Sequence, residues 1–155
     1  MEFGDHVIPF DHVIVKTRHS FIFTNIRPFL PLHILASPIS RKQRLYELTA
    51  EETSDLFNSV RVAMKGLREL CDGFTINIQD GECAGQTVFH AHVHIVPRVA
   101  QDLKDNNDIY KEGALDSADR PAREYNEMKE EAMRLREVIG KAFDAEGIYH
   151  QKSLQ

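Results

Sequence analysis

The stretch Val88–Val96 reads VFHAHVHIV and carries a histidine at every second position, at His90, His92 and His94. In a β-strand, side chains two residues apart project from the same face, at a spacing of about 6.7 Å. The four residues of the opposite face are all apolar: Phe89, Ala91, Val93 and Ile95. The pattern therefore predicts a strand with one face in the core and three aligned imidazoles on the other.

Three aligned imidazoles are open to three interpretations. A single strand histidine is most often a hydrogen-bonded structural residue, but three on one face favour a functional site. Imidazole can act as a nucleophile, an acid, a base or a metal ligand near neutral pH. A zinc site would need a further ligand from Cys, His or a carboxylate. The spacing alone does not separate a metal site from catalysis.

Composition narrows the class of protein. The 155 residues are 42% hydrophobic and 28% charged, which is typical of a single globular domain, and we expect one domain over 1–155. The net charge of −5 argues against binding to a nucleic acid polymer. The sequence has neither a run of 18 apolar residues nor a secretory segment, so we expect neither membrane insertion nor export. The cysteines Cys71 and Cys83 form no CxxC pair, so we expect a reducing, cytoplasmic location, with the nucleus as an alternative.

Other segments predict the remaining elements. Four β-rich runs are expected to form strands: Val13–Thr17, Ser20–Asn25, His33–Ser37 and Phe74–Gln79. Thr49–Glu52 is a capping-box pattern, which predicts a helix to about Cys71, and a second amphipathic helix is expected over 123–144. Between the core (3–98) and that helix, the segment 99–122 is predicted to be a mobile loop, with six acids and three bases in 101–121.

The longer stretch Gly85–Val96 resembles the His-φ-His-φ-His-φ-φ motif of the histidine triad (HIT) superfamily. The resemblance is strongest to the fragile histidine triad branch, the dinucleoside polyphosphate hydrolases. Further segments resemble that branch in the same order: Phe3–His6, Lys16–Phe21, Asn25–His33, Gln79–Gly81, Pro97–Arg98 and Asp108–Tyr110. The similarity covers residues 3 to about 112 and is weaker in the C-terminal helix. It implies an α+β fold, in which a five-stranded antiparallel sheet packs with two main helices, and a homodimer that forms one continuous sheet.

The resemblance also implies a reaction. In that branch the middle histidine, here His92, attacks the α-phosphorus of an adenine nucleotide and forms a covalent nucleotidyl-histidine intermediate. The expected activity is that of a bis(5'-adenosyl)-triphosphatase, which cleaves diadenosine triphosphate to AMP and ADP. His94 matches the histidine near the departing oxygen, where an imidazolium would offset developing charge. His90 and His33 match histidines that orient the nucleophile.

The same resemblance assigns substrate contacts. His6 matches a position near the nucleobase, Asn25 the ribose contact and Gln79 the residue that binds the phosphate bridge. The segment that contacts the phosphates consists of Gly85, Gln86, Thr87 and Val88. A divalent cation, Mg²⁺ or Mn²⁺, is expected to arrive with the substrate phosphates, and no tightly bound protein metal is expected because no acidic cage adjoins the motif. The expected partners are thus a small dinucleotide and a second copy of the chain.

Two departures from the family pattern concern loops. Leu32 stands where the family commonly has glycine, and a positive φ there would strain a leucine. Cys83 replaces a common proline. Tyr110 resembles a loop tyrosine linked to regulation, and we interpret His12, His19 and His150 as surface histidines.

Three rival functions remain open from sequence. The first is a nucleoside phosphoramidase, whose branch typically has serine at the position of Thr87. The second is a nucleotide-binding signalling protein with little turnover. The third is a zinc-binding protein.

Overall fold

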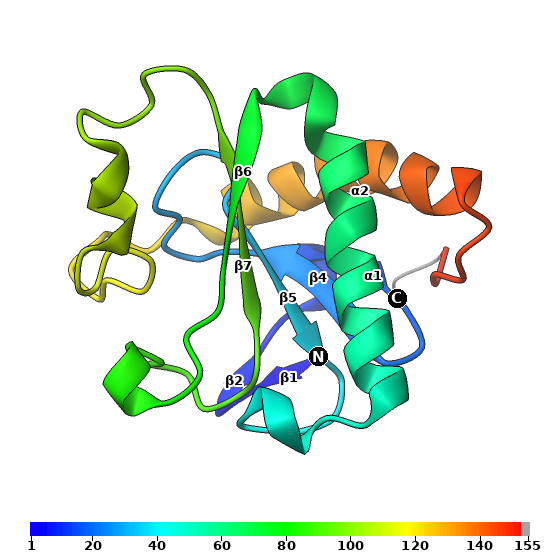
Figure 1. The fold of residues 1–155 in the computed structure, drawn as a ribbon. Coiled ribbons are helices and arrows are strands. Elements are labelled where there is room, and N and C mark those ends of the chain that lie inside the picture. The colour runs from blue at the N-terminus through cyan, green and yellow to red at the C-terminus, as the bar shows by residue number, and fades with distance from the viewer. Residues whose placement is uncertain (153–155) are drawn as a thin grey trace.

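The computed structural model describes residues 1–152 as an antiparallel five-stranded sheet with two long helices (Figure 1). The sheet strands are β3 (Val13–Lys16), β4 (Ser20–Thr24), β5 (Ile34–Pro38), β6 (Gly73–Asn77) and β7 (Val93–Arg98), in the order β3-β4-β5-β7-β6. The helices are α1 (Ala50–Leu67) and α2 (Tyr125–Ala145), and the 3₁₀ turns are η1 (Phe10–His12), η2 (Leu45–Glu47), η3 (Arg68–Leu70), η4 (Glu82–Ala84) and η5 (Asn106–Tyr110). Strands β1 (Glu2–Phe3) and β2 (His6–Val7) form a separate ribbon. The predicted α+β class, with five strands and two main helices, is confirmed.

Local sequence signals explain where these elements begin and turn. Helix α1 begins at the predicted capping box, where the Glu52 N–H donates to the Thr49 hydroxyl (3.2 Å) and the Thr49 N–H donates to the Glu52 carboxylate (2.9 Å). The predicted hairpin between β3 and β4 closes through a hydrogen bond from the Thr17 N–H to the Ser20 carbonyl (2.9 Å).

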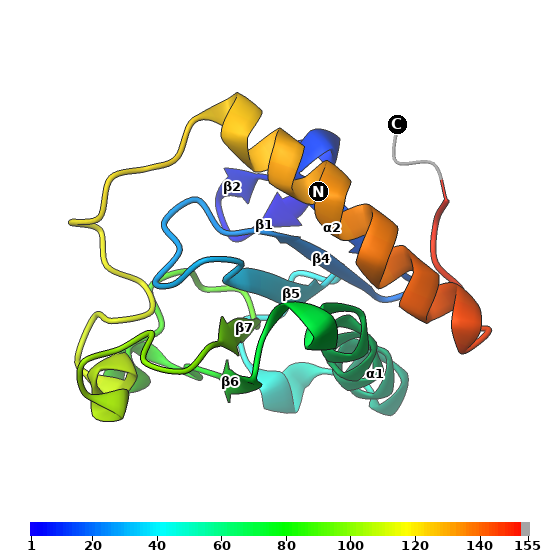
Figure 2. The ribbon, with the colours of Figure 1, turned by 90° about the horizontal axis from the view of Figure 1, so that it is seen from above.

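The sheet separates two differently packed sides. Both long helices pack on one side, as Figure 2 shows, against side chains such as Ile22, Ile34 and Ile95. Residues of opposite parity point to the other side, where the β1–β2 ribbon covers a second cluster with Phe21 and Phe23. On the same side, Ile109 and Leu115 of the segment after β7 pack in a third cluster with Val96. His94 alternates with the helix-side residues Val93 and Ile95 and therefore faces this second side. The predicted division of the histidine strand into a core face and a functional face holds in its second half.

The first half of the predicted histidine strand is not a strand. β7 begins only at Val93, where its ladder with β5 stops at the pair Ala36–Val93, although β5 itself continues to Pro38. In the preceding loop the His90 N–H donates to the Val88 carbonyl (2.8 Å), so local bonds replace a ladder. Phe89, predicted to be in the core, is 51% exposed.

The turn before β5 carries backbone strain. Leu32 has a φ of +62°, in the left-handed region that L-residues seldom adopt. The chain therefore keeps the turn that the glycine of related sequences would favour, and the next residue, His33, is completely buried.

No helix among the described residues is long and apolar enough to cross a membrane.

The close packing of α1 against α2 at Gly66 predicts how a larger side chain there would change the free energy of unfolding. A Cβ on Gly66 would lie 2.8 Å from the Ile139 Cα, so we expect Gly66→Ala to lower the free energy of unfolding by about 1–3 kcal/mol through overpacking. Gly140→Ala is the matched control, because its new methyl group would meet only the His150 Cε1 at 3.7 Å. This control should raise the free energy of unfolding by about 1 kcal/mol through helix propensity. Urea denaturation of both variants is the measurement, and equal effects would contradict the close packing.

Candidate active site

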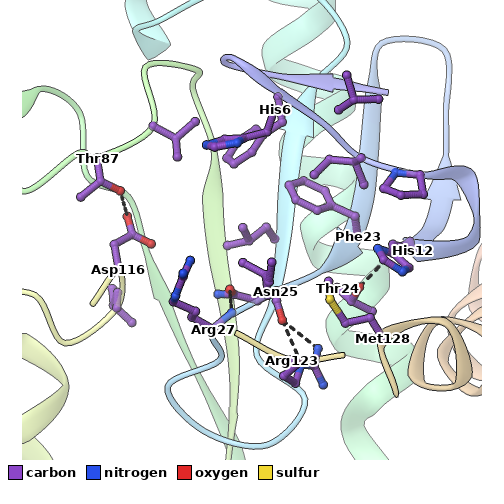
Figure 3. A pocket seen from close by; sticks show the side chains of 18 of the residues that line it. His6, His12, Phe23, Thr24, Asn25, Arg27, Thr87, Asp116, Arg123 and Met128 are labelled. Atoms are coloured by element: carbon purple, nitrogen blue, oxygen red, sulfur yellow. Dashed lines mark hydrogen bonds between the residues drawn. The ribbon is translucent and has the colours of Figure 1, made fainter. Parts of the chain in front are cut away.

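A cavity of about 600 Å³ opens between the β1–β2 ribbon, the end of β4 and the start of α2 (Figure 3). Its apolar wall includes Phe3, Phe23 and Met128, and its polar groups include Asn25 and Thr87. This mixture of an apolar wall and a few polar side chains is typical of a small-molecule site.

The hydrogen bond of the His92 ring determines which of its nitrogens is reactive. Its Nδ1 lies 2.7 Å from the backbone carbonyl oxygen of His90, which can only accept, so Nδ1 carries a proton. In the neutral ring, Nε2 then holds the free lone pair. The T-shaped contact with Phe3, at 5.1 Å between ring centroids, fixes the ring plane. His92 thus offers an oriented nitrogen nucleophile.

A second relay fixes His94. The Phe29 N–H donates to the His33 Nδ1 (3.0 Å), so the proton of the neutral His33 ring is on Nε2. That Nε2 lies 3.0 Å from the His94 Nδ1, which therefore accepts, and the proton of His94 is on its own Nε2. The Asn25 amide nitrogen is more distant from the same His33 atom, at 3.4 Å. His94 consequently has an N–H donor at Nε2, and its ring lies beside that of His92, with 4.9 Å between the ring centroids.

Burial keeps this relay neutral. Loss of solvent lowers the pKa of His94 to about 4, with a further contribution from the neighbouring His92, against the opposing effect of Asp116. The pKa of His33 is also lowered well below its ordinary value, mainly by burial. In the ligand-free protein at neutral pH, His94 is therefore an uncharged donor, whereas the family resemblance led us to consider an imidazolium.

His90 and His33 have different neighbours from those expected. The His90 Nδ1 accepts from the Gly4 N–H (3.1 Å), and its Nε2 donates to the Pro38 carbonyl (2.9 Å). His90 thus holds His92 through its backbone carbonyl, while its ring ties the loop to the ribbon and to β5. The ring of His33 hydrogen-bonds to His94 and not to His92, the expected nucleophile.

The expected substrate-binding residues divide into three groups. His6, Asn25, Thr87 and Val88 line the cavity. Gln86 is instead a buried clamp, because its side chain accepts from the Gly81 N–H (2.8 Å) and donates to the carbonyls of Gln43 and Val88.

Gln79 and Gly85 form a close pair beyond the end of β6. The pairing of Asn77 with His94 directs the chain so that Gln79 follows on the side of His92. A Cβ on Gly85 would lie 2.5 Å from the Gln79 amide nitrogen, so only glycine permits this approach. The buried Gln79 Oε1 has no partner among the described residues.

Sequence reasoning missed Asp116. This residue of the predicted loop lines the cavity and accepts a hydrogen bond from the Thr87 hydroxyl (3.1 Å). Its Oδ2 lies 3.9 Å from the His92 Nε2 and 3.8 Å from the His94 Nε2. Burial raises the pKa of Asp116, but the two histidines and Thr87 outweigh that effect, so the pKa lies below its ordinary value.

His12 was interpreted as a surface histidine, and this was wrong. It is buried against Tyr125, with 4.5 Å between ring centroids, and its Nε2 lies 3.1 Å from the Tyr125 carbonyl. Helix α2, which brings Tyr125 over β3, is 113 residues away in sequence, so no local signal marked this contact.

The same site contains a group of potential metal ligands. His92, His94 and Asp116 each offer one ligand atom, and these atoms lie within 4.8 Å of one another. The expectation that the protein holds no tightly bound metal remains a prediction.

Comparison with known proteins identifies the family. The HIT domain model matches residues 8–101, which is more than half of the chain. The chain belongs to the HIT-domain family. A nitrilase and fragile histidine triad fusion protein of Caenorhabditis elegans is 39% identical over 142 residues, which cover 90% of this HIT protein and 32% of the relative. The chain thus spans about a third of that fusion protein.

Two further relatives are of similar size to this HIT protein. A bis(5'-adenosyl)-triphosphatase of Dictyostelium discoideum is 39% identical over 139 residues, which cover 88% of the chain and 91% of the relative. The solved structure of diadenosine triphosphate hydrolase from Plasmodium falciparum superposes with a TM-score of 0.71 at 32% identity, covering 92% and 85% of the two chains. The fold and the predicted family are therefore confirmed, whereas the roles of individual site residues remain predictions.

The neutral state of His94 predicts a pH dependence of stability. In the unfolded chain the His94 ring binds a proton near pH 6.5, but in the folded site it does so only near pH 4. The contribution of neutral His94 to the free energy of unfolding is therefore fully present above pH 6.5 and decreases as the pH falls toward about 4. From about pH 7 to about pH 5, His94 should account for about 2 kcal/mol of lost unfolding free energy. Urea denaturation at both values should show a smaller loss for His94→Gln than for the parent, with the exposed His19→Gln as control. An unchanged loss in His94→Gln would contradict this assignment.

Proposed function

We propose that this HIT protein is a dinucleoside polyphosphate hydrolase that cleaves diadenosine triphosphate-like substrates to AMP and ADP. The observation that carries the proposal is the pair of ring nitrogens beside the cavity: a free lone pair on the His92 Nε2 and an N–H donor on the His94 Nε2. Relatives that are named bis(5'-adenosyl)-triphosphatase or diadenosine triphosphate hydrolase support the choice of substrate.

In the first step, the His92 Nε2 lone pair attacks the α-phosphorus, and a nitrogen–phosphorus bond forms. The bond from that phosphorus to the bridging oxygen breaks, and ADP leaves with its electron pair. The ring becomes positively charged, and the Nδ1–H bond to the His90 carbonyl becomes stronger because its donor is now cationic. The His94 N–H stabilises the negative charge that develops on the phosphate oxygens.

In the second step, water attacks the same phosphorus and the nitrogen–phosphorus bond breaks. AMP is released, the attacking water gives one proton to the solvent, and His92 returns to its neutral state with the lone pair on Nε2. Two displacements thus replace one more difficult displacement. Because burial keeps His94 and His33 neutral, we propose that Mg²⁺ or Mn²⁺ accompanies the polyphosphate and offsets its charge.

The nucleophile can be tested by substitution. His92→Ala should lower kcat for diadenosine triphosphate by about a thousandfold or more, because no other group replaces the lone pair. His19→Ala should retain the parental rate, and unchanged thermal unfolding would show that the His92 variant is folded. Near-normal hydrolysis by folded His92→Ala would overturn the mechanism.

A comparison of two substrates with different leaving groups distinguishes the proposed hydrolase from a nucleoside phosphoramidase. Purified enzyme should turn over diadenosine triphosphate with a higher kcat/KM than an adenosine 5'-phosphoramidate, with AMP and ADP in equal amounts. The reverse preference would favour the phosphoramidase, and tight binding without turnover would favour the signalling protein.

We also propose a homodimer that forms through the edge strand β6. The other edge, β3, is engaged by its own chain, because the Val13 carbonyl accepts from Arg136 and the Lys16 carbonyl accepts from the Gln151 N–H. No strand of the described chain pairs with the outer side of β6, where Ile76 is 37% exposed.

Light scattering should therefore give a mass of twice the 17.8 kDa of one chain. Ile76→Lys should reduce the mass toward that of one chain, because a charge would be buried at the strand junction. Val7→Lys, at a highly exposed position of the ribbon, is the control. A monomer at all concentrations would contradict the dimer.

A further inference from the structure

A carboxylate of the protein occupies the point where the reactive groups converge. The Asp116 Oδ2 lies 3.9 Å from the nucleophilic nitrogen of His92, 3.8 Å from the donor nitrogen of His94 and 3.1 Å from the Thr87 hydroxyl. Asp116 also lines the cavity, while the side chains of both histidines are at most 1% exposed. The carboxylate therefore lies between the two imidazoles and the space in which a nucleotide would bind.

The unpartnered Nε2 of His94 indicates that an anion binds at the point between the two imidazoles. The His94 Nε2 is buried and has no hydrogen-bond partner among the described residues. The relay from the Phe29 N–H through His33 places a proton on it, and the separation of 3.8 Å from Asp116 is too long for a hydrogen bond. Buried donors normally have an acceptor. A phosphate oxygen at normal hydrogen-bond distance would supply the missing acceptor, which the carboxylate does only poorly.

The segment around Asp116 is held in place without the carboxylate itself. Its neighbour Leu115 is 3% exposed and packs with Val96 and Ile109. The guanidinium of Arg120 donates to the carbonyls of Ala114 (2.7 Å) and Leu115 (2.9 Å). Removal of the Asp116 charge therefore leaves the anchors of this segment intact.

We propose that Asp116 is an intramolecular competitor for the phosphate group of the nucleotide and so determines how tightly the protein binds AMP. This inference rests on the proposed function, because it takes the α-phosphate position to be the point between His92, His94 and Thr87. A nucleotide phosphate can reach the two imidazoles only when the carboxylate leaves, since two anions cannot share one position. After hydrolysis, return of the carboxylate favours release of AMP.

Direct binding of AMP tests the proposal without turnover. Isothermal titration calorimetry of AMP, with EDTA present so that no metal bridges the three side chains, should give about tenfold tighter binding for Asp116→Asn than for the parent. The factor corresponds to a competent, open site that is populated about one tenth of the time in the parent. Asp116→Ala should show the same direction. Asp119→Asn is the matched control, because it removes an exposed carboxylate from the same segment.

The outcomes separate this inference from the proposed activity. Equal or weaker AMP binding by Asp116→Asn and Asp116→Ala would overturn the inference, even if the parent hydrolyses diadenosine triphosphate. Equal tightening in Asp119→Asn would also overturn it, because the effect would then be one of general charge. Tighter AMP binding by the two Asp116 variants alone supports the inference, and it does so even if neither protein hydrolyses the dinucleotide.

Discussion

The hydrogen bond from the His92 Nδ1 to the His90 carbonyl is the constraint on which this site depends. It is 2.7 Å long and joins a ring to the backbone two residues before it, so it places the lone pair on the opposite nitrogen. The loop before β7 is built to present that carbonyl. Gln86 clamps the loop, and the ring of His90 ties it to Gly4 and Pro38. The irregular loop that replaces the first half of the expected strand thus positions the His90 carbonyl, which keeps the proton of His92 on Nδ1.

The turn before β5 gives His94 the opposite arrangement, in which Nε2 carries the proton and acts as a donor. The strained turn at Leu32 precedes His33, whose ring lies within hydrogen-bond distance of His94. The backbone N–H of Phe29 donates to His33 and so determines which nitrogen of each ring carries the proton. Because burial keeps these rings uncharged, the arrangement is set by tautomers and not by ion pairs. Backbone groups therefore determine the chemistry that the side chains present.

Periodic signals in the sequence predicted the regular parts of this protein. The capping box at Thr49 and the stripe that follows it predicted α1, and the alternation at Val93–Val96 predicted the buried half of the histidine strand. Periodicity failed at Phe89, because it does not show where the pairing with a neighbouring strand stops. The contact of Asp116 with the triad could not be predicted either, because any of the six acids of 101–121 fits a polar loop and only the tertiary packing of Leu115 selects one.

The opposed polarity of the two ring nitrogens has a consequence for selectivity between anions. A lone pair and an N–H that converge on one point match a group with an electrophilic centre surrounded by acceptor oxygens, as in a phosphoric ester. A carboxylate such as that of Asp116 offers acceptor oxygens only, so it can attract the donor but has no electrophilic centre for the lone pair. Its separations of 3.8 and 3.9 Å agree with such a half-match. For the proposed activity, this opposed polarity favours a reactive phosphorus over an inert anion before any bond is made.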